Sequence, residues 1–438
     1  MTSESMEPVD AGADLAPGEP IDATVSAAKH DPYAAWRHRD FRLFFLSRVV
    51  GVLGEQMVGT AVGWQLYQLT GSELALGLVG LVQVLPIITL SLFAGTVVDR
   101  TYRRRIAIMA HSLLTVCSLA LLLLTVTGMA NTGALVLIYI CLLGIGVART
   151  FYTPAESSML PLLVPSQDFT NAVMWSSNSW QLASVFGPAV SGIVIARFGG
   201  PQSVYLLDVL AGVIAVTLLL MIRAKQTNFS NEPFSLQSIS AGAKFIFDTK
   251  VILAAVTLDM FAVLFGGAVA LLPVYATDIL KVGADGYGWL RAMPSIGALC
   301  MSLLLVQLPP FKRTGITLLG AVIGFGVCTI IFGLSTSFWL SLVTLFVLGA
   351  LDNISVVIRH SLVILYTPDV MRGRISAVNN VFIGTSNELG AFESGVAAEL
   401  LGPVGAVVFG GIGTILVVLG VGLRWPQLRN LRKLGGHT

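Results

Sequence analysis

Charged residues are scarce in this chain: they make up 11% of its 438 residues, whereas soluble domains average about 25%. Hydrophobic residues reach 55%, and the mean hydropathy is +0.82. A long chain so poor in charge is not a soluble protein, and its composition indicates many membrane crossings. The net charge of +2 identifies no partner, and no basic patch for nucleic acid is visible.

Signatures of enzymes and ATP-driven pumps are also missing. The chain has no Gly-x-x-x-x-Gly-Lys loop for nucleotide, which argues against ATP-driven pumping. Its five His residues are scattered without metal-ligand spacing, and no Ser/His/Asp arrangement is recognisable. The four Cys residues all fall inside apolar runs and give no sign of disulfides. We therefore expect no enzyme, cofactor or metal site; a membrane-embedded enzyme is an alternative only in principle.

Long apolar runs dominate what is present. Twelve runs reach the roughly 20 residues that a membrane-spanning helix needs. They cover residues 41–69, 74–98, 106–128, 133–160, 168–197, 201–223, 249–278, 286–308, 314–335, 338–366, 372–398 and 402–424. Continuous apolar runs favour helices, because barrel strands would alternate over about ten residues. The expected fold class is all-α integral membrane, with twelve transmembrane helices.

Lys and Arg residues gather on one side of this series. The two ends of the chain and the even-numbered connections hold 20 of the 26, while the odd-numbered connections hold only Arg197 and Lys281. Positive residues favour the cytoplasmic side of a membrane. An even number of spans with both termini in the cytoplasm accounts for this distribution.

The longest polar connection divides the chain into two halves. The expected divisions are a disordered acidic cytoplasmic tail over 1–35, a six-helix bundle over 36–223, a cytoplasmic linker that could hold an amphipathic helix over 224–248, a second six-helix bundle over 249–424, and a basic cytoplasmic tail over 425–438.

The two halves echo each other at a shift near 203 residues. Gly187 then lies over Gly390, and Gly192 lies over Gly395. At a shift of 204, Glu55 in the first run lies over Asp259 in the seventh. This register predicts two bundles related by a pseudo-two-fold axis.

A short motif lies between the second and third runs. Residues 95–105 read Gly-Thr-Val-Val-Asp-Arg-Thr-Tyr-Arg-Arg-Arg. The pattern Gly-x-x-x-Asp-Arg-x-x-Arg-Arg resembles the signature loop after the second helix of major facilitator superfamily transporters, although Tyr102 stands where that family most often has Gly. The resemblance implies a cytoplasmic gating loop made by Gly95, Asp99, Arg100, Arg103 and Arg104.

Two further stretches extend the resemblance. Residues 187–192, Gly-Pro-Ala-Val-Ser-Gly, are similar to the Gly-Pro-x-x-Gly-Gly motif of the superfamily's antiporters, with Gly187, Pro188 and Gly192 in place; simple packing of small residues is the alternative explanation. Residues 367–374 and 386–395 resemble the enterobactin-exporter-like branch, which includes macrolide-efflux relatives, but Ala391 stands where that branch usually has an acidic residue. The residues of this third stretch are Asp369, Arg372, Gly373, Arg374, Glu388 and Glu393.

Charged residues inside the runs are the candidates for coupling transport to protons. Ionisable groups are costly in a bilayer and usually face a cavity or a partner. In the superfamily fold, spans 1, 4, 7 and 10 line the cavity, and here they carry Glu55, Arg149, Asp259, Asp352 and Arg359. A carboxylate in such a cavity can exchange protons, and an Arg that moves beside it would couple proton release to substrate binding. A fixed ion pair is the structural alternative for each residue.

Further expectations concern the remaining polar groups. We expect Arg149 and Arg359 to be partnered inside the protein, with Asp352 and Glu55 as the favoured partners. Arg48, Asp208 and Arg291 are expected to reach an interface, while Glu388 and Glu393 are expected to be structural. The candidates for contact with substrate are Gln56, Trp64 and Gln65.

Together these features predict a monomeric secondary transporter of the bacterial inner membrane. It is expected to export a small organic molecule, drug-like or siderophore-like, by alternating access and proton antiport. Its partners would be that substrate, protons and the lipid bilayer, without nucleic acid. The direction rests on the resemblance to the exporter branch and on the Gly-Pro motif. A proton-coupled uptake symporter of the same fold is the alternative; a channel or a non-transporting membrane protein is less favoured.

Overall fold

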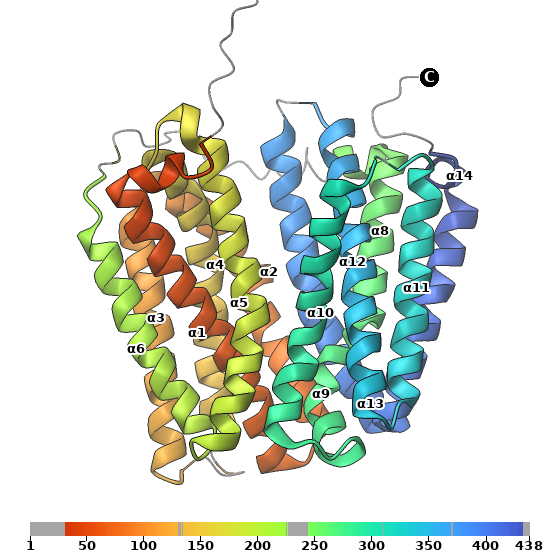
Figure 1. The fold of residues 1–438 in the computed structure, drawn as a ribbon, viewed down its shortest axis with the longest axis horizontal. Coiled ribbons are helices and arrows are strands. Elements are labelled where there is room, and N and C mark those ends of the chain that lie inside the picture. Colours follow the sequence, from red (N-terminus) through yellow and green to blue (C-terminus); the bar gives the residue numbers. More distant parts are fainter. Residues whose placement is uncertain are drawn as a thin grey trace, which may run out of the picture.

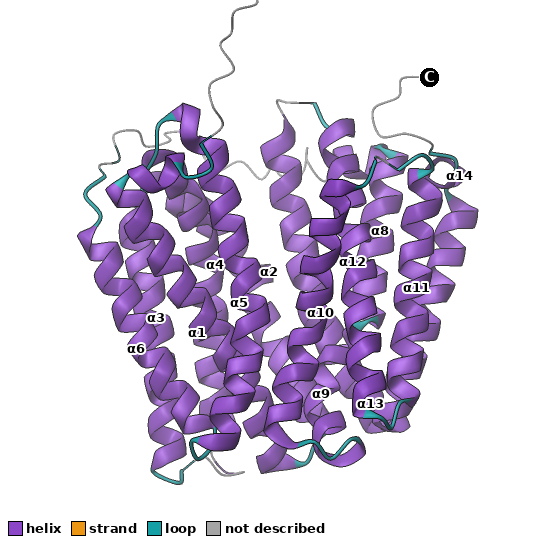
Figure 2. Ribbon diagram, in the orientation of Figure 1, coloured by secondary structure: helices purple, strands orange, loops and turns teal. Residues whose placement is uncertain are grey.

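The computed structural model describes residues 31–129, 133, 135–224, 226, 244–309, 311–368 and 371–431. In these ranges every regular element is a helix (Figure 2). The expectations for residues 1–30, for most of the linker, for Asp369 and for residues 432–438 lie outside the described residues. The side chains of Arg372, Gly373 and Arg374 are likewise not described.

The first half of the chain forms six long helices. They are α1 (Arg39–Thr70), α2 (Glu73–Arg100), α3 (Arg103–Val126), α4 (Leu135–Met159), α5 (Phe169–Arg197) and α6 (Pro201–Met221), with short 3-10 turns η1 (Ala34–Arg37), η3 (Leu160–Leu162) and η4 (Ser166–Asp168). Local sequence sets the boundary between α1 and α2. Gly71 ends α1 in the left-handed conformation (φ 60°), and the Ser72 side chain caps α2 by accepting from the Ala75 N–H.

The second half contains one interrupted and four long helices. They are α8 (Lys250–Phe265), continued by η5 (Gly267–Leu271), α9 (Leu272–Val274) and the π-helical η6 (Tyr275–Ile279), then α10 (Gly283–Gln307), α11 (Thr314–Leu334), α12 (Phe338–Tyr366), α13 (Arg372–Arg424) and the short α14 (Pro426–Arg429). The expected run 249–278 is thus broken rather than one regular helix. Gly266 and Gly267 stand at the break, and Pro273, which has no N–H to donate, follows in α9.

Helix α13 covers two expected runs at once. Its 53 residues include Gly402, whose backbone is non-helical (φ 74°, ψ 161°), followed by Pro403. Figure 1 shows α13 descending in light blue and returning in dark blue, with its label at the bend. Each of the twelve expected runs therefore falls on a helical segment of the described chain.

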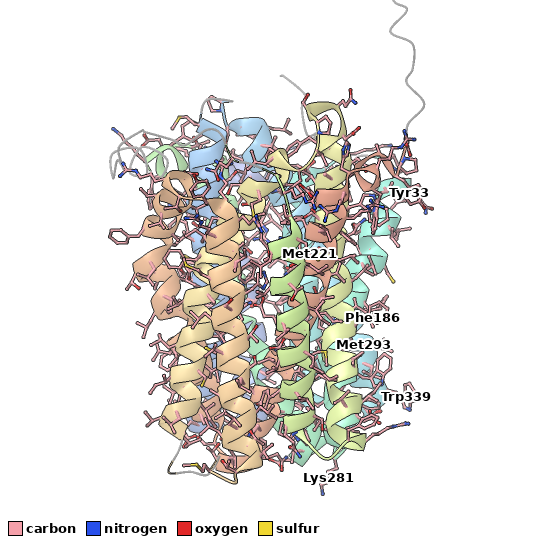
Figure 3. All side chains as sticks on the ribbon, turned by 90° about the vertical axis from the view of Figure 1, so that its left-hand side faces the viewer. Tyr33, Phe186, Met221, Lys281, Met293 and Trp339 are labelled. Carbon is pink, nitrogen blue, oxygen red and sulfur yellow. The ribbon has the colours of Figure 1, made fainter. Side chains whose placement is uncertain are left out.

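The helices have the length and composition of membrane spans. Among the described residues, ten helices are long and apolar enough to cross a membrane, with α13 counted once. The 32-residue α1 is not among them, since Glu55, Gln56 and Gln65 interrupt its apolar sequence. Large apolar side chains lie exposed on the flanks, as Trp339 does in Figure 3 at 75% exposure. Such flanks suit contact with lipid.

The two halves stand side by side and meet along two helix pairs. Helices α1 to α6 form one group and α8 to α14 the other (Figure 1), and α5 packs on α10 while α2 packs on α13. The beginning of α1 and α14 lie at the same end of the molecule (Figure 1). Lys281 lies at the opposite end from Tyr33 (Figure 3). We call these the Tyr33 end and the Lys281 end.

Candidate functional site

A cavity of about 750 Å³ lies between the two halves. Helices of both groups supply its walls, which include Glu55 and Gln56 of α1, Arg149 of α4, Asp352 of α12 and Glu388 of α13. The cavity is the natural candidate for a substrate site, because pockets for small ligands measure about 300–1,000 Å³ and combine apolar walls with a few polar groups.

Two of the three side chains expected to contact substrate do not line this cavity. Gln65 is buried, donating to the Thr125 hydroxyl (2.9 Å) and accepting from the Tyr205 hydroxyl (2.6 Å). Gln65 is nine residues from Gln56, which is two and a half helical turns, so the two side chains face opposite sides of α1. Trp64 stacks on Tyr287 with ring centroids 5.7 Å apart. The expectation is therefore wrong for Gln65 and Trp64 in this state, while Gln56 lines the cavity.

Close glycine contacts seal the Lys281 end of the cavity. A Cβ built on Gly192 of α5 would lie 2.7 Å from the Gly288 Cα of α10. A Cβ built on Gly395 of α13 would lie 2.5 Å from the Gly77 Cα of α2. Gly192 and Gly395 are the residues that superpose in the repeat register. Because neither pair leaves room for a side chain, the helices are in backbone contact at this end.

Polar contacts reinforce the same seal. Tyr67 at the end of α1 donates to the Asp278 carboxylate of η6, and the Gln68 amide donates to the Thr277 hydroxyl (3.5 Å). Each contact joins the first half of the chain to the second, so separating the halves at this end would break both.

The gating-loop motif lies at the other end. A Cβ on Gly95 would meet nothing within 4 Å, and the Asp99 side chain is 55% exposed, 4.0 Å from Arg103. Arg103 donates to the Ser158 carbonyl (2.9 Å) and Arg104 to the Leu219 carbonyl (2.8 Å). Both cations therefore bind near the C-terminal ends of α4 and α6, where helix carbonyls favour positive charge. We expect Asp99 to approach the beginning of α13 when this end of the molecule is closed, and this latch stays a prediction.

The glycines of the α5 motif are positions of close helix packing. A Cβ on Gly187 would lie 2.5 Å from the Gln56 Cβ, and Ser191 donates to the Met57 carbonyl of α1 (3.0 Å). Pro188 presents its carbonyl 2.7 Å from the Cβ position of Gly288. The motif thus holds α5 against α1 on one side and α10 on the other.

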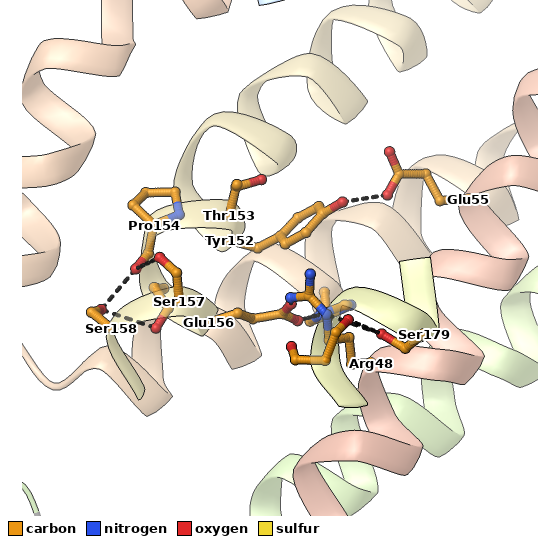
Figure 4. A network of polar contacts seen from close by, with 12 residues as sticks. Arg48, Glu55, Tyr152, Thr153, Pro154, Glu156, Ser157, Ser158 and Ser179 are labelled. Atoms are coloured by element: carbon orange, nitrogen blue, oxygen red, sulfur yellow. Dashed lines mark hydrogen bonds and ion pairs between the residues drawn. The ribbon is translucent and has the colours of Figure 1, made fainter. Parts of the chain in front are cut away.

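Arg149 is the centre of the first charged network in the cavity wall. Its Nε lies 2.5 Å from Glu55 Oε1, and its Nη1 lies 3.5 Å from Glu388 Oε1. The same Nη1 donates to Gln83 Oε1 (2.9 Å), and Tyr152 donates to Glu55 Oε2 (2.5 Å; Figure 4). Glu55 is therefore a partner of Arg149, as expected. Glu388 comes from the opposite half, so Arg149 links the halves through it.

A second ion pair lies behind the cavity wall in the other half. Arg359 of α12 pairs with Asp259 of α8 and donates from Nε to the Ser355 carbonyl (3.3 Å). These two residues line a small neighbouring pocket, together with Asp352, but not the main cavity. The expectation that Asp352 partners an Arg is wrong here, because Arg359 reaches across to α8 instead of along its own helix. Asp352 has no hydrogen bond or ion pair among the described residues.

A third network lies in the first half and escaped prediction. Arg48 Nη1 lies 2.5 Å from Glu156 Oε2, its Nε donates to Ser179 (3.2 Å), and His111 Nε2 lies 2.8 Å from Glu156 Oε1 (Figure 4 shows Arg48, Glu156 and Ser179). Arg48 therefore does not reach an interface as expected. Glu156 is 1% exposed. In the sequence, Glu156 stands in Pro-Ala-Glu-Ser-Ser near the end of α4, a stretch typical of an exposed helix end. Only its contacts with Arg48 and His111 show that it belongs to a buried network.

Asp208 and Arg291 also differ from expectation. Asp208 is buried and accepts from the Ser118 hydroxyl (2.5 Å). Gly54 of α1 leaves room for its carboxylate, because a Cβ at position 54 would overlap that group. Arg291 lines the cavity and donates to the Tyr287 hydroxyl (3.1 Å). Asp208 turns inward to a partner on the neighbouring α3, and Arg291 turns inward to a partner one turn earlier on its own helix α10. Glu393, by contrast, does not line the cavity and contacts the Ser394 hydroxyl (3.5 Å).

Metal chemistry finds no support in the described residues, where no group of three or more His, Cys, Asp or Glu side chains could hold an ion. Three of the four cysteines are buried and all four are free.

Solved structures share this architecture. A POT family transporter in complex with 5-aminolevulinic acid superposes with a TM-score of 0.70 at 12% identity, covering 89% of this chain and 97% of that one. A bacterial homologue of the iron transporter ferroportin, in an inward-facing state, superposes with a TM-score of 0.66 at 15% identity, covering 90% and 99%. At these identities the likeness establishes the fold alone.

Sequence relatives narrow the family. The enterobactin exporter EntS of Citrobacter koseri is 24% identical over 396 residues, covering 90% of this chain and 94% of the relative, and that of Escherichia coli matches to the same extent. The family model described as transmembrane secretion effector matches residues 30–433. These matches place the chain among transporters and not among enzymes. The chain belongs to the transmembrane secretion effector family, and it is a multi-pass secondary transporter of the major facilitator superfamily.

Proposed function

We propose that this protein exports a small organic molecule across the bacterial cytoplasmic membrane by alternating access, driven by proton antiport. The observation that carries the proposal is the cavity of about 750 Å³ between the two halves, with an Arg149 network in its wall that joins both halves. A chain that contains the whole cavity can act as a monomer.

The Tyr33 end is proposed to face the cytoplasm, with both termini on that side. It carries the Arg-rich connection between α2 and α3, whereas the opposite end carries only Arg197 and Lys281, and positive residues favour the cytoplasm. On this orientation the glycine contacts seal the external side. The cavity then faces inward, the state in which an exporter receives its substrate.

Coupling is proposed to operate through the carboxylates that surround Arg149. Glu55 belongs to the same half as Arg149, while Glu388 belongs to the other. When the halves rock about the cavity, the 3.5 Å contact to Glu388 changes first, and the positive charge that stabilises that carboxylate withdraws. A proton bound in one state is then released in the other. Asp259 and Arg359 form the corresponding pair of the second half, and Asp352 stands between that pair and the cavity.

Export is favoured over uptake because the sequence relatives are named as exporters. An uptake symporter of the same fold is the second candidate, since the solved neighbours include a nucleoside transporter and peptide transporters.

The test is accumulation in an efflux-deficient bacterial strain that expresses the protein. A catechol siderophore, a macrolide and a lipophilic dye are each offered, with and without a protonophore. We expect at least one compound to accumulate less in expressing cells, and the protonophore to abolish the difference. Increased accumulation in expressing cells would support the uptake symporter instead. The control is an Arg149→Ala variant that is present in the membrane at the same abundance.

A further inference from the structure

The cavity has more acidic than basic side chains. Among the described residues, its charged lining consists of the carboxylates Glu55, Asp208, Asp352 and Glu388 and the guanidinium groups Arg149 and Arg291. This imbalance matters because a charge in a poorly hydrated site needs a partner of opposite sign.

The two Arg side chains do not compensate all four acids. Arg149 lies within 4 Å of both Glu55 and Glu388 and is committed to them. Arg291 donates to the Tyr287 hydroxyl and pairs with no acid among the described residues. Among the described residues, Asp208 accepts from Ser118, and Asp352 has no hydrogen-bond or ion-pair partner. Each half of the protein thus presents one carboxyl group without a cation.

The wall around Asp352 offers two acceptor oxygens and an aromatic ring. The next residue, Asn353, also lines the cavity, and its buried Oδ1 has no hydrogen-bond partner in the described residues. Phe325 lines both the main cavity and the small pocket that Asp352 borders. A carboxylate, an unpaired amide oxygen and an aromatic face all attract positive charge. An anion at this wall would meet repulsion from the carboxylate and from the ring face.

We infer that the transported molecule is a lipophilic organic cation, whose positive group is bound in the main cavity by Asp352 and Asn353 of α12 beside the Phe325 ring. The inference rests on the proposed function and names the substrate class of its cavity. The space of about 750 Å³ admits a drug-sized cation. A compound whose only charge is negative is disfavoured at the same wall.

Tetraphenylphosphonium and tetraphenylborate provide the test, because the two ions have nearly the same shape and opposite charge. Each is titrated separately into the purified full-length protein in detergent, with empty micelles subtracted, by isothermal calorimetry. We expect tetraphenylphosphonium to bind at least about tenfold more tightly than tetraphenylborate. Asp352→Asn should weaken tetraphenylphosphonium binding by about tenfold or more, because the amide keeps the shape and loses the charge.

Glu399→Gln is the matched control, since Glu399 is an exposed acid of α13 outside the cavity wall. It should retain parent affinity, and gel filtration of each variant establishes that it is folded. Equal or tighter binding of tetraphenylborate, unchanged binding by Asp352→Asn, or no binding of tetraphenylphosphonium would each overturn the inference. Binding needs no gradient, so cation selectivity without gradient-driven export would reject only the proposed function. Export of siderophore or another compound without cation selectivity would reject only this inference.

Discussion

Gly192 of α5 lies in backbone contact with Gly288 of α10. A Cβ added to Gly192 would lie 2.7 Å from the Gly288 Cα, and a Cβ added to Gly288 would lie 2.8 Å from the Gly192 Cα. Backbone cannot move aside as a flexible side chain can, so any larger residue must push the two helices apart. Since this contact seals one end of the cavity, alternating access requires it to form and separate in every cycle.

Gly192→Val should therefore open the Lys281 end. The readout is modification of a cysteine introduced at Val269, which lines the cavity and is 36% exposed, in a background without the four native cysteines. A membrane-impermeant thiol reagent added outside intact cells should react severalfold faster in the Gly192→Val variant. Gly320→Val is the control, because a Cβ at Gly320 of α11 would meet nothing within 4 Å. Equal labelling of the two variants would mean that the Gly192 contact is not a gate.

Asp99→Asn should weaken the closed state at the Tyr33 end. Asp99 is largely exposed here, and in the opposite state we expect it to approach the amides that begin α13, where a helix carries about half a positive charge. Removing the negative charge should favour the state open at the Tyr33 end and slow transport, while membrane abundance is unchanged. Counterflow in proteoliposomes measures the rate, with Glu399→Gln as an exposed control. Transport at the parent rate would show that Asp99 is no latch.

Glu55→Gln should uncouple transport from protons. Glu55 lies in the cavity wall and is bound by Arg149 and Tyr152, whereas Asp259 lies behind the wall with Arg359. Proteoliposomes with Glu55→Gln should lose their response to an imposed pH gradient but retain substrate exchange. Asp259→Asn is made in parallel as the corresponding change in the second half. If both variants keep gradient-driven transport, the two carboxylates have a structural role.

The helices could be predicted from the sequence because they depend on local order. A run of apolar residues gives a helix wherever it lies, and Gly71 or Gly402 marks an end by its own conformation. The partners of charged groups depend instead on how helices are rotated and placed against one another. That is why spacing favours Asp352 as an Arg partner although Arg359 pairs with Asp259, and why it places Gln65 in the cavity although Gln65 faces α3 and α6. Spacing along one helix does not reveal which neighbour each face meets.

The Arg48–Glu156–His111 network is predicted to stabilise the first half rather than to carry protons. Glu156 is 1% exposed and does not line the cavity, and it holds Arg48 (2.5 Å) and His111 (2.8 Å) from two other helices. Glu156→Leu leaves the partly buried Arg48 guanidinium without its acidic partner, which should cost about 3 kcal/mol and lower the apparent Tm in detergent on the order of 10 °C. Adding Arg48→Met should recover part of that loss, because the double variant removes the unpaired charge. Glu399→Gln should leave the Tm unchanged. A Glu156→Gln variant with the parent Tm but no response to a pH gradient would instead make Glu156 part of the transport cycle.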